Sequence, residues 1–460
     1  MSIYRKTSMR VLILLAIVSL LAIAASPLPV PAGPGGMIKK PAAKNIIVMI
    51  ADGRGFNHVT AASYYETGKF DRQIYNRFPF RFAVSTYPAY YEGDPCYGKG
   101  YDPVAVWKDF TYVKSCYTDS AAAATALATG VKTYEGAIGV DLNKMPLKNV
   151  VQVAEERGKA TGVITSVPLS HATPAGFVAH NVDRENLEAI AQEMIYQSGL
   201  EVLMGAGNPY YDADGELITD PANFDFEYVG GQATWDDLVA GTAGAPDNWT
   251  LIQTRAEFRA LQKGPTPKRV IGVPQVYETL QQGRGGDAWA DPFVVPFIKT
   301  VPTLVEMTNA ALNVLDNDPD GFFLMIEGGA IDWAAHDNQS GRMIEEHIDF
   351  DNAVEAVVKW VNTHSNWGET MLIVTNDHET GYLTGPGSDP TWTPIINHGA
   401  GHLPGMQWNY DDHTNSLVPI FAKGDAARMF TRYANHYDPV HGRYIDNTDI
   451  AKVVFWAIGP

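Results

Sequence analysis

Short apolar segments that each run into polar or charged residues recur along the chain. The clearest are NIIVMIADG, which reaches Asp52, FFLMIEGG, which reaches Glu327, and MLIVTNDHETG, which reaches Asp377 and His378. The segments TGVITS and LVPIFAKG follow the same pattern. Apolar runs of this length with many β-branched residues are typical of buried parallel strands.

Segments with helical character lie between these runs, at residues 150–157, 184–197, 303–315 and 343–361. This alternation of strands and helices predicts an α/β fold, an α/β/α sandwich with a mostly parallel central sheet. In such sheets ligands bind beyond the carboxyl ends of the strands. The polar residues that follow the apolar runs are therefore candidates for a functional site.

The composition is that of a globular protein, since 45% of the 460 residues are apolar and 19% are charged. Two stretches, around residues 205–300 and 385–412, are rich in Gly, Pro, Asp and Trp and have weak periodicity. We interpret them as loop insertions in one large domain over residues 45–460. The sequence has no internal repeat.

The N-terminus has the features of a secretory signal peptide. Arg5, Lys6 and Arg10 precede an apolar segment of 15 residues, which is shorter than the roughly 20 residues of a transmembrane helix. The sequence AIA at 22–24 offers a cleavage site. We predict a signal peptide at 1–24, a Pro/Gly-rich tether at 25–44, and a protein exported to the periplasm or secreted, without a membrane span in its mature form. An uncleaved N-terminal anchor is the alternative.

The net charge and the cysteine count bound the partners and the compartment. A formal net charge of −18 argues against a nucleic acid or an anionic membrane as the partner. Cys96 and Cys116 are the only cysteines. In an exported chain such a pair is expected to form a disulfide, and metal ligation by the two thiols is the alternative.

Seven acidic residues and histidines could together bind metal ions. They are Asp52, Glu327, Asp332, His336, Asp377, His378 and His413. Asp332 and His336 are four residues apart, so one helical turn puts both on the same face. Mixed shells of imidazole and carboxylate suit zinc, whereas shells of oxygen alone suit magnesium. Taken singly, each residue has an ordinary alternative as a turn residue, a helix cap or a surface charge.

The segment DSAAAAT places Ser120 at the start of a helix of small residues that ends near Gly130. Backbone N–H groups at a helix N-terminus favour anions, and a serine beside a dication is readily deprotonated and becomes a nucleophile. The alternative is that Ser120 only caps the helix. In SHATPAGFVAHNVDR, Thr173 is a candidate hydroxyl ligand for a hard cation, and Arg184 could bind two phosphate oxygens.

With these motifs the chain resembles the alkaline phosphatases, from Asn45 to about Lys423. DSAAAAT, at 119–125, is close to the nucleophile signature of that family. The resemblance implies hydrolysis of phosphate monoesters with two zinc ions and one magnesium ion. Since many members are homodimers, it also makes a homodimer the expectation.

The resemblance also implies a role for each residue. Ser120 would form a phosphoserine, and Arg184 would hold the phosphate. One zinc would be bound by Asp332, His336 and His413, the other by Asp52, Asp377 and His378, and the magnesium by Asp52, Thr173 and Glu327. His171 and Trp333 would lie near the phosphate, at two positions where members of the family differ.

Three other functions compete with this interpretation. A related metal-dependent phosphodiesterase remains an alternative. A sulfatase requires a modifiable Cys or Ser followed by Pro and Arg, whereas Ser120 is followed by alanines. A secreted protein that binds metal or phosphate without turnover is disfavoured, because both the nucleophile and the full ligand set are present.

Overall fold

The computed structural model describes residues 43–459, except residues 245 and 390. The predicted signal peptide and residues 25–42 of the predicted tether lie outside the described residues. Within the described part, no helix combines the length and the apolar composition that crossing a membrane requires.

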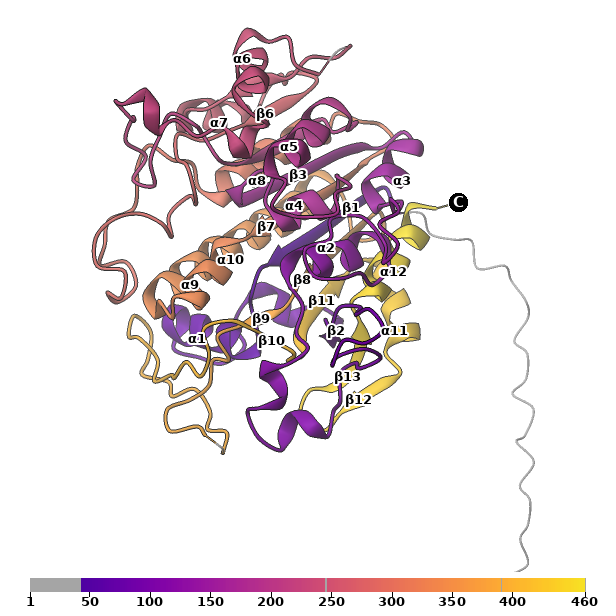
Figure 1. Cartoon of the computed structure of the whole chain (residues 1–460), viewed down its shortest axis with the longest axis vertical. Helices are drawn as coiled ribbons and strands as arrows, with labels where there is room; N and C mark the ends of the chain where they lie inside the picture. Colours follow the sequence, from indigo (N-terminus) through magenta and orange to yellow (C-terminus); the bar gives the residue numbers. More distant parts are fainter. Residues whose placement is uncertain (1–42, 245, 390, 460) are drawn as a thin grey trace, which may run out of the picture. The chain divides into compact units, whose positions relative to one another are not determined.

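A mixed, mostly parallel sheet of 11 strands forms the centre of the fold (Figure 1). The strands run in the order β12-β13-β2-β11-β8-β1-β7-β3-β4-β6-β5. Their bounds are β1 (Asn45–Ala51), β2 (Phe80–Ser85), β3 (Ala160–Pro168), β4 (Val202–Ala206), β5 (Thr250–Ile252), β6 (Val270–Gly272), β7 (Phe322–Gly328), β8 (Thr370–Thr375), β11 (Val418–Lys423), β12 (His436–Asp438) and β13 (Gly442–Asp446). β9 (Glu379–Thr380) and β10 (His413–Thr414) form a separate antiparallel pair.

The register of the central strands brings the predicted site residues to one edge of the sheet. β1 is parallel to both β7 and β8, and Ile50 lies opposite Glu327 on one side and Thr375 on the other. Asp52 directly follows β1, and Asp377 follows β8 by one residue. The carboxyl ends of three neighbouring strands therefore converge, as the sequence predicted.

Helices cover both faces of the sheet, because alternate residues of each strand point to opposite sides. In β1, Ile46 and Val48 belong to one apolar cluster, and Ile47 and Met49 belong to the other. The first face packs against α2 (Ser120–Thr129), α3 (Val150–Glu156), α4 (Ala172–Gly176), α5 (Leu187–Tyr196), α6 (Gln232–Ala240), α11 (Phe430–Tyr433) and α12 (Thr448–Ile458). The second packs against α1 (Phe56–Thr67), α7 (Arg255–Leu261), α8 (Leu304–Leu315), α9 (Ala330–His336) and α10 (Ser340–His364). This arrangement confirms the predicted α/β/α sandwich.

The two stretches expected to be loop insertions differ from each other. The region 205–300 contributes β5 and β6, which extend the sheet at one edge, together with α6 and α7. Among its described residues, the region 385–412 contains no helix and only isolated bridges, such as Ile396 with Gly405.

Candidate active site

Ser120 is the first residue of α2, and the structure separates its role from that of the helix cap. Asp119 is the N-cap residue, and its Oδ1 accepts a hydrogen bond from Ala122 N at 3.0 Å. Ser120 Oγ instead lies 3.1 Å from His378 Nε2. Because the cap is supplied by Asp119, the Ser120 hydroxyl is available for chemistry.

The first group of candidate ligands surrounds His378. Its Nε2 lies 3.1 Å from Asp377 Oδ2 and 3.6 Å from Asp52 Oδ1. All three side chains are fully buried. The loops that carry them are tied together, since Gly53 N donates a hydrogen bond to Asp377 Oδ1 at 3.1 Å.

The second group joins α9 to β10. Asp332 Oδ2 lies 3.4 Å from His336 Nε2, and Asp332 Oδ1 lies 3.7 Å from His413 Nε2. The two Nε2 atoms are 3.0 Å apart. His336 Nδ1 is 2.8 Å from Asp411 O, and His413 Nδ1 is 2.8 Å from Thr118 O. When each Nδ1 donates its proton to its carbonyl, both Nε2 lone pairs face the carboxylate. This arrangement fits a cation such as zinc.

A third set of oxygen atoms lies on the other side of Asp52. Thr173 Oγ1 on α4 is 3.3 Å from Asp52 Oδ2. Glu327, at the end of β7, accepts a hydrogen bond from Thr165 Oγ1. All of these donors are oxygen atoms, which is the ligand type that magnesium prefers.

The electrostatics of the buried carboxylates in these three sets also favour bound cations. Burial and the neighbouring carboxylates raise the pKa of Asp52 well above its ordinary value. Burial likewise raises the pKa of Glu327 to about 7 and that of Asp377 to about 6. Asp52 Oδ1, Glu327 Oε1 and Asp377 Oδ2 are buried without a hydrogen-bond partner. Crowded carboxylate oxygens without donors are stabilised by metal ions, so the residues fit the expected metals.

Arg184 lines the same cleft as Ser120. Its NH1 donates to Asp119 Oδ2 at 3.1 Å, and its NH2 lies 3.2 Å from His171 Nε2. Desolvation and the Arg184 charge lower the pKa of His171 to about 3, so this imidazole is neutral. The Trp333 ring packs edge-on against His171 at a centroid distance of 5.6 Å.

A cleft of about 580 Å³ exposes this arrangement. Seven of its lining residues are predicted site residues: Ser120, His171, Arg184, Asp332, Trp333, His336 and His413. The structure thus brings together all the residues that the sequence analysis assigned to the phosphate and to the metals. The lining also includes Gln282 and Arg342, which the sequence analysis did not identify.

The sequence analysis also missed Arg54, which connects the loops that carry Asp52 and Asp377. Arg54 is fully buried, and its Nε donates to Asn376 Oδ1 at 2.6 Å. Its NH1 donates to Tyr75 OH at 3.1 Å. A charged residue between two glycines in ADGRG, directly after a buried strand, was the available signal.

Comparisons with known proteins agree with this geometry. The family model described as alkaline phosphatase matches residues 43–404. The chain belongs to the alkaline phosphatase family. The match ends before His413, which the structure nevertheless brings to Asp332 and His336.

Individual relatives support the same assignment. Alkaline phosphatase 3 of Bacillus subtilis is 30% identical over 350 residues, which cover 74% of this chain and 61% of that protein. Alkaline phosphatase 4 of the same species is 31% identical over 372 residues, covering 77% and 66%. The chain thus spans less than two thirds of the length of these two relatives.

A solved structure shares the fold. The cold-active alkaline phosphatase from the psychrophile Shewanella sp. superposes with a TM-score of 0.65 at 26% identity. The alignment covers 90% of this chain and 100% of that one.

Proposed function

We propose that this member of the alkaline phosphatase family hydrolyses phosphate monoesters through a phosphoserine on Ser120. The observation that carries the proposal is the position of Ser120 Oγ, which lies at the N-terminus of α2 and 3.1 Å from His378 Nε2. A hydroxyl at that position can attack a phosphorus atom whose oxygens face Arg184 and the helix N-terminus.

We expect one zinc ion at Asp332, His336 and His413, and a second at Asp52, Asp377 and His378. Magnesium is expected at Asp52, Thr173 and Glu327. When bound, these cations supply positive charge that acidifies hydroxyl groups and stabilises developing negative charge.

The residues of the chain then perform two displacements. Ser120 Oγ attacks phosphorus in line with the ester oxygen, so that an O–P bond forms, the ester P–O bond breaks and the alcohol leaves. Water next attacks the phosphoserine, which releases inorganic phosphate and restores the hydroxyl. In both steps Arg184 holds non-bridging oxygens, and Asp119 orients its guanidinium.

The disulfide between Cys96 and Cys116 supports the further proposal that the protein is exported. Periplasmic and secreted destinations both provide the oxidising environment in which such a bond persists. The predicted signal peptide at 1–24 is consistent with either of them.

The phosphoserine is the feature to test. The zinc- and magnesium-loaded protein is incubated with p-nitrophenyl phosphate, quenched in acid, digested and analysed by mass spectrometry. We expect one phosphate on the peptide that contains Ser120, and none on the same peptide of Ser120→Ala. Turnover without any label on Ser120 in a rapid quench, or a label on another residue, would refute the proposal.

A further inference from the structure

A second cavity, of about 250 Å³, shares no lining residue with the catalytic cleft. Six of its 17 lining residues carry aromatic rings: Phe56, Tyr101, Trp107, Tyr382, Trp392 and His441. The proposed phosphatase reaction uses none of these residues.

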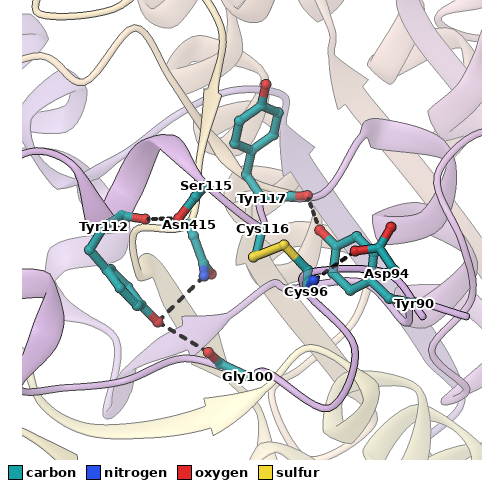
Figure 2. Close-up of a disulfide and its surroundings, with 9 residues drawn as sticks. All are labelled: Tyr90, Asp94, Cys96, Gly100, Tyr112, Ser115, Cys116, Tyr117 and Asn415. Atoms are coloured by element: carbon teal, nitrogen blue, oxygen red, sulfur yellow. Dashed lines mark hydrogen bonds between the residues drawn. A yellow bond between two sulfur atoms is a disulfide. The ribbon is translucent and has the colours of Figure 1, made fainter. Parts of the chain in front are cut away.

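Segments far apart in the sequence build this aromatic cavity. The Cys96–Cys116 disulfide closes a loop of the chain (Figure 2). Two residues of the cavity lining, Tyr101 and Trp107, belong to this loop. Within that loop, Tyr112 OH donates to Gly100 O at 3.1 Å. Trp392 comes from the region 385–412, and His441 lies between β12 and β13. The disulfide and the hydrogen bonds within its loop hold one wall of the cavity in place.

The rings contact one another in defined geometries. Phe56 stacks on His441 with centroids 4.0 Å apart. Trp107 meets Trp392 edge to face at 5.5 Å, and its centroid lies 5.5 Å from His441. Such mutual packing fixes the orientation of the ring faces, and π faces carry negative potential.

Charged groups around the cavity add to that negative potential. Asp438 Oδ2 accepts hydrogen bonds from Tyr101 OH at 2.7 Å and from Trp107 Nε1 at 2.9 Å. Although burial acts in the opposite direction, hydrogen bonds from His441 N and from these two rings lower the pKa of Asp438, which keeps it anionic. Donation to an anion makes both rings richer in electrons.

Among the described residues, the lining contains no lysine or arginine. Its one acidic side chain is Glu379, and burial raises the pKa of that carboxyl to about 7. Burial lowers the pKa of His441 to about 4, so this imidazole is neutral. A cavity that combines aromatic rings and aliphatic side chains without a positive charge is complementary to a cation with an apolar surface.

We propose that the aromatic cavity is a binding site for a small organic cation of the quaternary ammonium class. A trimethylammonium group presents methyl groups to aromatic rings and needs no hydrogen-bond acceptor, which suits a cavity lined by aromatic and aliphatic side chains. The overall net charge of −18 favours the approach of such a cation.

The first test compares choline with its neutral isostere, in which carbon replaces the quaternary nitrogen. Binding to the wild-type protein is measured by calorimetry and by quenching of tryptophan fluorescence. We expect choline to bind at least about tenfold more tightly than the isostere, since only the cation gains a cation–π contact. Equal affinities would show an apolar cavity without selectivity for cations, and absence of binding by both would also overturn the proposal.

Variants then assign the site. Trp107→Leu and Trp392→Leu should each weaken choline binding by about 5- to 30-fold, the loss expected for one cation–π contact. Trp289→Leu is the matched control, because Trp289 is 71% exposed and does not line the cavity. Circular dichroism and p-nitrophenyl phosphate turnover check that each variant is folded. Choline affinity that is unchanged in both folded cavity variants would contradict the assignment.

Discussion

Replacing Arg184 by alanine isolates the contribution of the chain to phosphate binding. Arg184 is oriented by two contacts, from NH1 to Asp119 at 3.1 Å and from NH2 to His171 at 3.2 Å. Its guanidinium carries five N–H donors, so donors remain for two phosphate oxygens. Because Asp119 keeps its hydrogen bonds from Ala122 N and Gly136 N, we expect the variant to fold.

The expected decrease in kcat/KM follows from the hydrogen bonds between Arg184 and the phosphate that the variant cannot form. A hydrogen bond to a charged group contributes about 1.5 to 3 kcal/mol, and Arg184 would make two of them. The Arg184 side chain is 22% exposed, so we take a value from the lower part of that range for each hydrogen bond. The two hydrogen bonds together then contribute about 3 to 4 kcal/mol. This corresponds to a decrease in kcat/KM of roughly a hundredfold to a thousandfold.

The assay is the rate of p-nitrophenyl phosphate hydrolysis, together with inhibition by inorganic phosphate. Arg184→Lys keeps the positive charge but loses the planar guanidinium that can bind two oxygens at once. We expect its kcat/KM to lie between those of wild type and Arg184→Ala. Arg157→Ala is the matched control, because Arg157 is exposed at the end of α3. A kcat/KM for Arg184→Ala within about threefold of wild type would refute the role.

Two further predictions concern buried charges. Burial raises the pKa of Glu346 from 4.5 to about 8, so the folded state keeps a proton that the unfolded chain releases, and stability falls as pH rises between those values. Glu346→Gln should therefore raise the free energy of unfolding by about 5 kcal/mol above pH 8 and by little near pH 4.5. Urea denaturation measures this, and a difference that does not change with pH would contradict it. Arg54→Met removes the donor to Asn376 Oδ1 and should weaken zinc retention by about 10- to 100-fold against a competing chelator, whereas Arg77→Met, at an exposed position, should not. Equal zinc retention in both variants would exclude a positioning role for Arg54.

The sequence predicted the centre of the fold because buried parallel strands are distinctive. β1, β7 and β8 are continuous apolar runs, and their carboxyl ends must meet at one edge of the sheet. Asp52, Glu327 and Asp377 therefore converge for a topological reason that can be recognised in the sequence. The start of α2 was equally clear, although only the structure assigned the cap to Asp119 and left Ser120 free.

Other features depend on contacts that no local pattern encodes. β5 and β6 are three residues long each, which is too short for a periodic signal, and pairing alone makes them strands. The hydrogen bond between Arg54 and Asn376 joins residues 322 positions apart. Trp107 and Trp392 likewise meet only because two loops that are far apart in the sequence line the same cavity.

The most direct test of the proposed function compares wild type with Ser120→Ala in p-nitrophenyl phosphate turnover at alkaline pH, with metal analysis of both proteins. Ser120 Oγ is 3.1 Å from His378 Nε2, and Ala preserves the helix because Asp119 provides the cap. We predict an active wild type and a variant that retains its zinc but loses almost all activity. A wild type that binds zinc without turnover, or a variant as active as wild type, would contradict the account.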